Sequence, residues 1–282
     1  MPIIERLFRF ARKPLPDKRA AITATLRGLF HADPGRLHGL LTGAHAPPRV
    51  LQADEMMYLA YRPDSDVFFK RHSELAQLSD KWIRDNIINN AGDLPRLYAL
   101  VLNIKHVLDD NVMGDLAELG VYRGNSAALL AHYARIYSRK VFLFDTFEGF
   151  DRRDIIGVDR SKPAAFADTS LDQVRELVGD DDVTFVQGWF PQSIPPDLYA
   201  SRFCLVHIDC DLYAPAKAAL EFFYPRLSPG GLLIVHDYAS PAWRGIKRAV
   251  DEYCRAIPER PIIFGDKSGT AMIRKSAMNV IS

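Results

Sequence analysis

The stretch DLAELGVYRGNS, residues 115–126, decides the fold. The apolar run at its start predicts a β-strand, and the spacing of the apolar residues that follow predicts a helix over 126–137. Gly120 and Gly124 allow a tight turn between the two and a close approach of a ligand to the backbone, while Ser126 is a candidate N-cap of the helix. Because the glycines lie four residues apart, this turn is not the GxGxxG turn of a dinucleotide site.

Strands and helices alternate on both sides of this stretch. Helical spacing of apolar residues predicts helices at 94–108, 214–224 and 242–256. Shorter apolar runs bounded by turn residues predict seven strands, the last two as a hairpin, at 115–119, 140–144, 183–187, 203–208, 232–235, 261–264 and 270–274. Such alternation is typical of a mainly parallel sheet with helices on both faces. We therefore predict a doubly wound α/β fold with a mostly parallel, seven-stranded sheet.

The chain divides into two regions. Residues 1–90 are broken by prolines into short pieces and are predicted to form a helical N-terminal extension, whereas residues 91–282 are predicted to form the α/β domain. Residues 3–13 have the pattern of a basic amphipathic helix, which could make a peripheral contact with an anionic membrane. We favour the alternative that this helix docks on the protein itself or on a subunit partner, and we expect a homo-oligomer.

Composition limits the partners and the cellular location that we expect for the protein. The formal net charge of the 282 residues is +1, which gives no electrostatic reason to expect a nucleic-acid partner. The sequence contains no apolar run of about 18 residues, so no transmembrane helix is expected, and its start lacks the features of a secretory signal. Cys204, Cys210 and Cys254 show no CxxC spacing, so we expect reduced cysteines in a cytoplasmic protein.

The ends of the first two strands carry carboxylates. Ligands of parallel sheets bind beyond the carboxyl ends of the strands, so Glu118 could meet a cationic ligand such as S-adenosylmethionine (SAM), which has positive ammonium and sulfonium groups. Asp145 lies 25 residues after Gly120, where an acid can accept the ribose hydroxyls of a nucleoside. The alternatives are an ordinary strand-to-helix turn and an aspartate that caps a helix or lies on the surface.

A second set of polar side chains follows the fourth and fifth strands. Asp209 and Asp211 follow the fourth, and His236 and Asp237 follow the fifth. Carboxylates suit Mg²⁺, and a histidine extends the choice to Mn²⁺ or Zn²⁺. A divalent ion lowers the pKa of a bound hydroxyl, and a neighbouring carboxylate can take the proton. The alternative is that these side chains cap helices and hold loops.

Five segments carry a family resemblance: ELGVYRGNS (118–126), FDTFEGF (144–150), GWFPQSIP (188–195), HIDCDLY (207–213) and LSPGGLLIVHDY (227–238). In this order they resemble the macrocin O-methyltransferase family. The resemblance implies a Rossmann-like methyltransferase domain that uses SAM and Mg²⁺ to methylate hydroxyl groups of sugars, often on glycosylated natural products. Its implied partner is a small-molecule or glycan acceptor.

The resemblance also implies roles by position. The positions implied in donor binding are Glu118, Gly120, Tyr122, Ser126, Asp145, Gln187, Gly188, Trp189 and Asp209. Asp145 would contact the ribose, and the block from Gln187 to Trp189 would lie near the adenine. Asp209 and Asp237 resemble metal ligands, and Asp211 resembles the proposed general base.

His236 departs from the family pattern, because well-known members carry an acidic residue at this position. A histidine can still ligate a metal ion together with Asp209 and Asp237, but it removes one negative charge. This change leaves open a metal-free mechanism in which His236 is the base, so Asp209, Asp211 and His236 are the candidate catalytic residues.

The polar segment between Phe150 and Leu177 has two interpretations. Ser170 and Gln173 have capping-box spacing and predict the start of a helix. Similar enzymes close this segment as a lid over donor and acceptor, and lid closure excludes water; a surface loop with a helix is the alternative.

Two other functions compete with methyl transfer. Asp209-Cys210-Asp211 reads as the DxD motif of a metal-dependent glycosyltransferase, although the glycine turn and Asp145 precede it in the order expected for SAM. The change at His236 also allows a catalytically impaired accessory protein that binds the donor.

Overall fold

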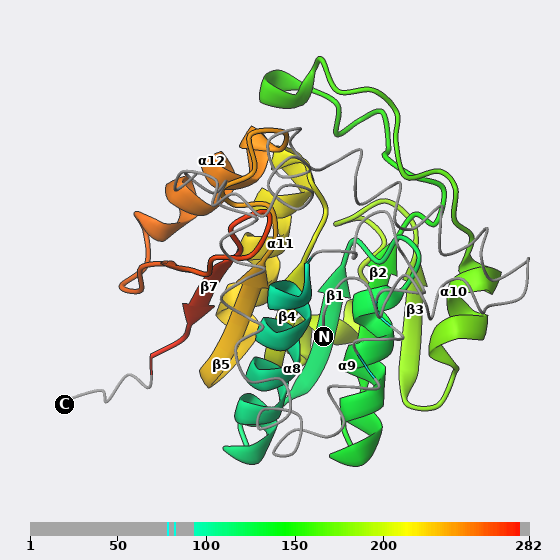
Figure 1. The fold of residues 1–282 in the computed structure, drawn as a ribbon, viewed down its shortest axis with the longest axis vertical. Helices are drawn as coiled ribbons and strands as arrows, with labels where there is room; N and C mark the ends of the chain where they lie inside the picture. Colours follow the sequence, from blue (N-terminus) through cyan, green and yellow to red (C-terminus); the bar gives the residue numbers. More distant parts are fainter. Residues whose placement is uncertain (1–77, 79–81, 83–92, 277–282) are drawn as a thin grey trace, which may run out of the picture. The chain divides into compact units, whose positions relative to one another are not determined.

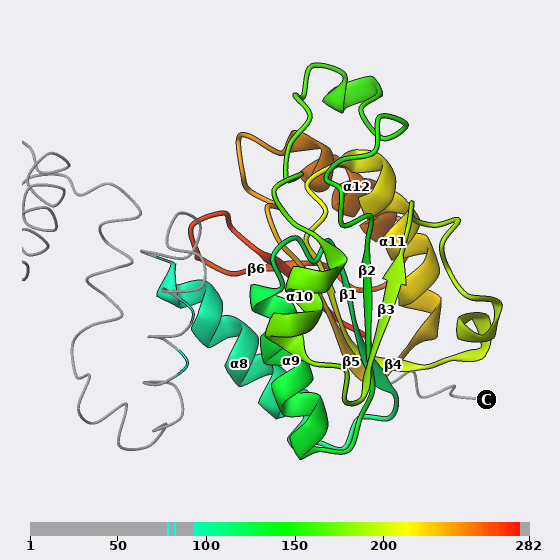
Figure 2. The same cartoon turned by 90° about the vertical axis from the view of Figure 1, so that its right-hand side faces the viewer.

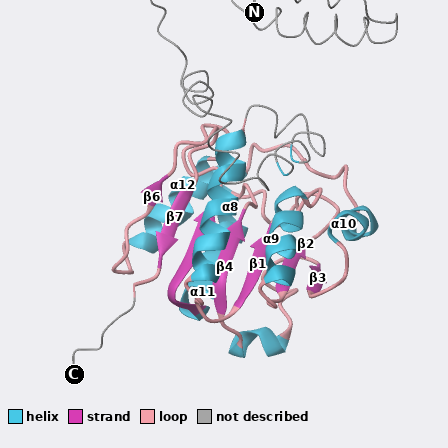
Figure 3. Ribbon diagram, turned by 60° about the horizontal axis from the view of Figure 1, so that its bottom comes forward, coloured by secondary structure: helices cyan, strands magenta, loops and turns pink. Residues whose placement is uncertain are grey.

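The computed structural model describes Leu78, Trp82 and residues 93–276. The predicted seven-stranded α/β fold is confirmed within them: one sheet has the strand order β3-β2-β1-β4-β5-β7-β6, as Figure 3 shows. The strands β1 to β5 are parallel, and β7 runs antiparallel to both β5 and β6. They are β1 (Asp115–Leu119), β2 (Val141–Asp145), β3 (Val183–Gln187), β4 (Phe203–Ile208), β5 (Leu227–Val235), β6 (Ile262–Ile263) and β7 (Ala271–Arg274). The predictions for residues 1–90, including the amphipathic helix at 3–13, lie almost entirely outside the described residues.

Helices cover both faces of the sheet (Figures 1 and 2). One face carries α8 (Leu94–Asp109), α9 (Asn125–Ile136) and α10 (Leu171–Val178), and the other carries α11 (Tyr213–Arg226) and α12 (Arg244–Cys254). Successive strand residues point to opposite faces, so Leu205 of β4 belongs to the core beneath α8 and α9, whereas Val206 belongs to the core beneath α11. Among the described helices, none is long and apolar enough to cross a membrane.

The fifth strand differs from its prediction. It begins at Leu227 rather than at residue 232. Phe203 pairs with Leu227 and Leu205 pairs with Leu232, so residues 228–231 leave the regular ladder as an irregularity. At Gly231, an added Cβ atom would lie 2.9 Å from the carbonyl oxygen of Cys204. The sequence pattern did not reveal this part of the strand because a bulged segment lacks apolar alternation.

The start of α9 also corrects a prediction. The helix begins at Asn125 with Gly124 as its N-cap, at a φ of 83°, so Ser126 is not the cap. The hydroxyl of Ser126 donates instead to Oε1 of Glu118 at 2.5 Å. A hydrogen bond to a buried carboxylate is stronger than one to a backbone amide, which explains why the serine lies inside the helix.

Gly120 fixes the distance between the two central strands at their carboxyl ends. Its φ is 88°, and an added Cβ atom would lie 2.0 Å from the carbonyl oxygen of Asp209. The backbone N–H of Asp209 donates to the carbonyl of Leu119 at 2.8 Å. The turn after β1 and the acidic segment after β4 therefore pack directly against each other, with their backbones in close contact.

Replacing Gly120 with alanine should lower the free energy of unfolding by about 3 kcal/mol, because it combines a backbone clash with an unfavourable positive φ. Gly157→Ala is the matched control: its φ is 56°, and an added Cβ would meet no atom within 4 Å. It should cost only about 1 kcal/mol. Urea unfolding of both variants measures the difference, and equal losses would contradict a role for close packing at Gly120.

Candidate active site

A cavity opens at the carboxyl ends of β1, β2, β4 and β5. Its wall includes Gly120 and Tyr122 from the turn after β1, Asp145 from the end of β2, and Asp209 and Asp237 from the segments after β4 and β5. These are the strand ends at which parallel sheets bind ligands. The structure thus brings the predicted donor turn and the predicted acidic cluster to the same cavity.

Asp145 holds the turn that follows β1. Its Oδ2 accepts hydrogen bonds from the backbone N–H groups of Val121 and Tyr122 at 2.6 and 2.9 Å, and its Oδ1 accepts from that of Phe147 at 2.7 Å. A carboxylate can accept about four hydrogen bonds. The hydroxyl of Thr146 also lies 3.4 Å from Oδ1, but it lies closer to the carbonyl oxygen of Gly149, at 2.6 Å. Asp145 therefore shapes the turn and keeps room for about one further donor, such as a ribose hydroxyl.

Glu118 lies behind the turn and does not reach the cavity wall. It is fully buried, and its Oε1 meets the hydroxyl of Ser126 at 2.5 Å and Nδ1 of His207 at 2.7 Å. Its Oε2 has no hydrogen-bond partner among the described residues. In this arrangement Glu118 orients the start of α9, where Ser126 itself lines the cavity.

Asn125 is a cavity residue that the sequence analysis missed. Both its amide oxygen and its amide nitrogen are buried, and in the described part of the chain neither has a hydrogen-bond partner. An amide offers both donors and an acceptor to a polar ligand. The signal that could have identified it is its place as the first residue of α9, because unpaired backbone N–H groups at a helix start also face a ligand.

The block after β3 reaches the cavity in part. Gly188 and Trp189 line the wall, whereas Gln187 is exposed and does not. The indole N–H of Trp189 donates to Asp154 at 3.0 Å, and the guanidinium of Arg153 lies 3.8 Å from the centre of the indole ring. Trp189 is therefore held by the segment that follows β2.

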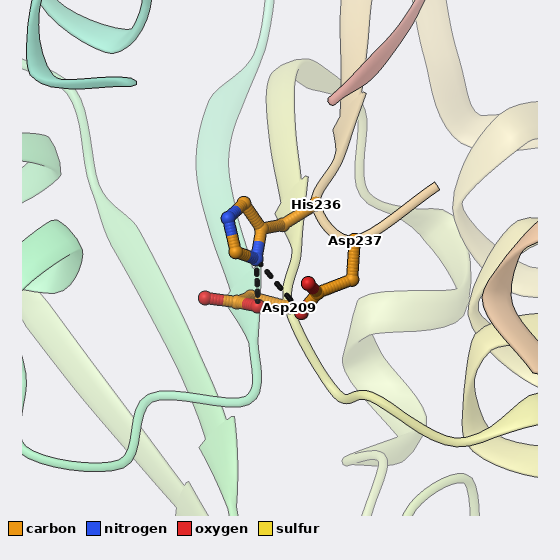
Figure 4. A group of neighbouring side chains, drawn as sticks. All are labelled: Asp209, His236 and Asp237. Atoms are coloured by element: carbon orange, nitrogen blue, oxygen red, sulfur yellow. Dashed lines mark hydrogen bonds and ion pairs between the residues drawn. The ribbon is translucent and has the colours of Figure 1, made fainter. Parts of the chain in front are cut away.

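The acidic cluster gathers at the ends of β4 and β5 (Figure 4). Nδ1 of His236 lies 2.9 Å from Oδ1 of Asp209 and 2.9 Å from Oδ2 of Asp237. One potential ligand atom from each of the three residues falls within 4.8 Å of the others. The predicted metal-ligand residues therefore lie together, and at these distances His236 hydrogen-bonds both carboxylates.

Arg96 completes this cluster and was not found from the sequence. It lies in the first turn of α8, and its guanidinium forms a partly buried ion pair with Oδ2 of Asp209. Its Nε has no partner among the residues that the structure describes. No motif surrounds Arg96, so only the packing of α8 beside the sheet could reveal that it belongs to the site.

The charges of the cluster determine its proton affinities. Burial alone would raise the pKa of Asp209, but Arg96 and then His236 hold it well below its usual range. Burial and Arg96 each lower the pKa of His236, and the two carboxylates outweigh them and raise it to about 10. Burial, together with the charges of Asp209 and Asp237, raises the pKa of Asp211 well above its usual range. Asp211 is therefore the carboxyl of this group that holds a proton most strongly.

Aromatic side chains form the other side of the cavity. Phe166 packs edge-on against Tyr122 and Phe150, with ring centres 5.1 Å apart in both pairs, and Phe150 lies 5.7 Å from Trp243. All four rings line the cavity. Together, Tyr122, Phe150, Phe166 and Trp243 make an aromatic wall. The sequence predicted Tyr122 for donor binding, and it did not reveal the other three because they come from separate segments.

The segment between β2 and α10 runs beyond the strand ends (Figure 1), and several of its residues bond to other segments. Buried Asp159 accepts a hydrogen bond from the backbone N–H of Tyr213 at 2.7 Å. Asp168 accepts from the hydroxyl of Tyr122 at 2.8 Å and pairs with Arg123. The predicted helix cap is confirmed, since Ser170 accepts from the backbone N–H of Gln173.

Known proteins are similar to the part of the chain that forms this domain. The family described as "Macrocin-O-methyltransferase (TylF)" matches residues 91–272. A relative from Streptomyces olivaceus, named 8-demethyl-8-(2,3-dimethoxy-alpha-L-rhamnosyl)-tetracenomycin-C 4'-O-methyltransferase, is 38% identical over 174 residues. Mycinamicin III 3''-O-methyltransferase from Micromonospora griseorubida is 32% identical over 181 residues. Each match covers 57% of this chain, and they cover 65% and 68% of the two relatives. The structure of the O-methyltransferase NovP matches with a TM-score of 0.56 at 28% identity, over 64% of this chain and 80% of that one.

Asp154 should make stability depend on pH. Burial raises its pKa to about 6, against a smaller opposing effect of the hydrogen bond from Trp189. The folded protein therefore retains a proton that the unfolded chain has lost, and stability should fall as pH rises from about 4 to about 6. Asp154→Asn keeps an acceptor for the indole N–H and removes this loss, so it should be more stable than the wild type by about 2 kcal/mol at neutral pH.

Urea unfolding at about pH 4 and about pH 7 measures this effect. Asp181→Asn, at an exposed position, controls for the loss of a charge and should not reproduce it. A difference between Asp154→Asn and the wild type that is the same at both pH values would contradict the prediction.

Proposed function

The chain belongs to the macrocin O-methyltransferase family, and from this premise we propose that it is a SAM-dependent O-methyltransferase acting on a hydroxyl group of a sugar or a glycosylated small molecule. The observation that carries the proposal is the cavity in which the turn at Gly120, Asp145 and the cluster around Asp209 meet. Two relatives are named O-methyltransferases, and the name of the first includes a rhamnosyl group. Membership in this family also favours methyl transfer over a glycosyltransferase that uses Asp209-Cys210-Asp211 as DxD.

The side of the cavity that holds Gly120 suits the donor. Gly120 lets the backbone approach a ligand, Asp145 has acceptor capacity for a ribose hydroxyl, and the unpartnered amide of Asn125 can bind a polar group. Gly188 and Trp189 supply the wall where we expect the adenine. When bound, SAM supplies an electrophilic methyl group on a positively charged sulfur, so the protein contributes orientation and electrostatics.

The acceptor hydroxyl needs a group that takes its proton as the new bond forms. Asp211 is buried and lines the cavity, so its carboxyl group, when ionised, is placed to take the proton of a hydroxyl bound there. In the proposed reaction the hydroxyl oxygen bonds to the methyl carbon, the O–H proton moves to Asp211, and the electron pair of the C–S bond stays on sulfur. Phe150, Phe166 and Trp243 of the aromatic wall would contact the acceptor, because the apolar faces of sugars and aglycones pack on aromatic rings.

The predicted divalent ion fits this cluster poorly. Asp209, His236 and Asp237 offer the right types of ligand, but His236 already bridges the two carboxylates, and Arg96 holds the other oxygen of Asp209. A metal ion would have to displace hydrogen bonds on both sides of Asp209. We therefore assign no step of the reaction to a metal ion.

Cytoplasmic localisation and assembly into a homo-oligomer stay predictions from the sequence.

The direct test of the proposed function is a calorimetric titration with SAM, followed by mass spectrometry of a panel of glycosides incubated with the protein and SAM. We expect SAM to bind and one acceptor class to gain the mass of one methyl group. A nucleotide sugar serves as the control ligand. Binding of the nucleotide sugar in place of SAM would reject methyl transfer.

Asp211→Asn should lower kcat by a factor of about 10²–10⁴, the range for loss of a general base, while the affinity for SAM stays close to that of the wild type. Asn is nearly isosteric with Asp but cannot take the proton. Asp197→Asn, an exposed change of the same kind, should leave both quantities unchanged. A loss of SAM affinity without loss of kcat would make Asp211 a binding residue.

Trp243→Ala should raise KM for the acceptor about tenfold with little change in the affinity for SAM, because it removes part of the aromatic wall at the acceptor side. Trp243→Phe keeps an aromatic ring and should recover much of the loss. Steady-state kinetics with each substrate varied in turn separates the two effects. A selective loss of SAM affinity would assign the wall to the donor.

A further inference from the structure

Arg96 introduces a permanent positive charge into the cluster where the family resemblance implies a metal ion. A guanidinium stays protonated in proteins, and here it is buried against Asp209 with its side chain 12% exposed. Its Nε–H group is buried without a partner in the described part of the chain. Arg96 also lines the cavity, so its charge lies at the wall of the space where we expect the acceptor.

Both oxygens of Asp209 are already occupied. Oδ2 receives the guanidinium of Arg96, and Oδ1 lies 2.9 Å from Nδ1 of His236. The same nitrogen lies 2.9 Å from Oδ2 of Asp237. Each oxygen of Asp209 thus already accepts from a group of the protein, and an ion bound to Asp209 would share its carboxylate with a guanidinium of like charge.

The residue types in the cluster also disfavour a divalent metal ion. Divalent ions such as Mg²⁺ are held mainly by carboxylates, and position 236 is a histidine where an acidic residue is the family pattern. Asp93 and Asp237 also face Arg96 and favour its charged form, whereas His236 is a second cationic group beside it. The cluster therefore offers two carboxylates as ligands, with a histidine and a guanidinium beside them.

We propose that Arg96, held on Asp209, is the resident cation of this site and makes methyl transfer independent of a divalent metal ion. This inference rests on the proposed function. The guanidinium supplies N–H groups and positive charge beside the acceptor oxygen, which stabilises the negative charge that develops there. The hydroxyl proton moves to Asp211, the C–S bond breaks with its electron pair left on sulfur, the C–O bond forms, and Arg96 keeps all its protons.

The first experiment measures metal binding directly and does not depend on methyl transfer. The full chain, treated with EDTA and dialysed, is titrated with Mn²⁺, and free Mn²⁺ is followed by electron paramagnetic resonance. We expect the wild type to bind Mn²⁺ no more tightly than His236→Ala. The double variant Arg96→Met with His236→Asp restores an acidic pair and removes the cation, so it should bind Mn²⁺ at least about tenfold more tightly, within the range by which groups around a metal ion change its affinity.

The second experiment uses methyl transfer to an acceptor found in the glycoside panel. The wild-type rate should be the same in EDTA and in Mg²⁺. Arg96→Met should lower kcat on the order of 10²-fold, comparable to the loss of one charge-stabilising donor, and Arg96→Lys should recover part of it. Affinity for SAM, measured by calorimetry, verifies that each variant retains its fold.

Stoichiometric binding of Mn²⁺ to the wild type, with turnover lost in EDTA and restored by Mg²⁺, would overturn the inference and leave the proposed function intact. Full turnover of Arg96→Met would overturn it as well. If no glycoside is methylated under any condition, the proposed function fails, and the Mn²⁺ titration still decides whether Arg96 excludes a metal ion from the cluster. If Arg96→Met does not fold, the wild-type titration and its response to EDTA decide the question.

Discussion

The close packing of β1 against β4 at Gly120 is the constraint on which the site depends. With no side chain, Gly120 lets its backbone lie against the carbonyl of Asp209, and the backbone N–H of Asp209 bonds back to Leu119. This contact holds the turn after β1 beside the acidic segment after β4. It follows that a cavity between them can present a donor-binding turn on one side and carboxylates on the other. Asp145 completes the arrangement, because its three backbone hydrogen bonds hold the turn in one conformation.

The acidic cluster is stable only because its charges are compensated. Buried carboxylates without partners are costly, and two of those in this site, Asp209 and Asp237, are matched by Arg96 and His236. Asp211 lacks such a cation, and this difference divides the carboxyl groups by role. Asp209 and Asp237 remain charged and hold the cluster together, whereas Asp211 has the higher proton affinity. The environment of each group, and not its residue type, therefore sets its proton affinity.

Features that depend on local sequence could be predicted, and features that depend on distant packing could not. The strands at 115–119, 183–187 and 203–208 were predicted at their observed bounds, because each is an apolar run with clear turn residues at its ends. Strand-end acids such as Asp145 and Asp209 could be identified since a parallel sheet brings its carboxyl ends to one edge. Arg96 and the aromatic wall were missed because their members meet only through tertiary packing, and Ser126 was taken for a helix cap because nothing in the local pattern reveals the buried carboxylate of Glu118.

The position of Arg96 also links the site to both ends of the described domain. Asp93 and Arg96 lie at the start of α8, and Asp93 accepts a hydrogen bond at 3.3 Å from the backbone N–H of Lys267, in the turn between β6 and β7. The next residue, Ser268, hydrogen-bonds Asp237. The charged cluster is therefore held from three directions: by α8, by the strands β4 and β5, and by the turn between the last two strands. The position of the guanidinium depends on the backbone that carries Arg96. The helix α8 and this turn therefore fix the position of the positive charge, as the sheet fixes the position of the carboxylates. In this arrangement the chain itself supplies both signs of charge in the cluster.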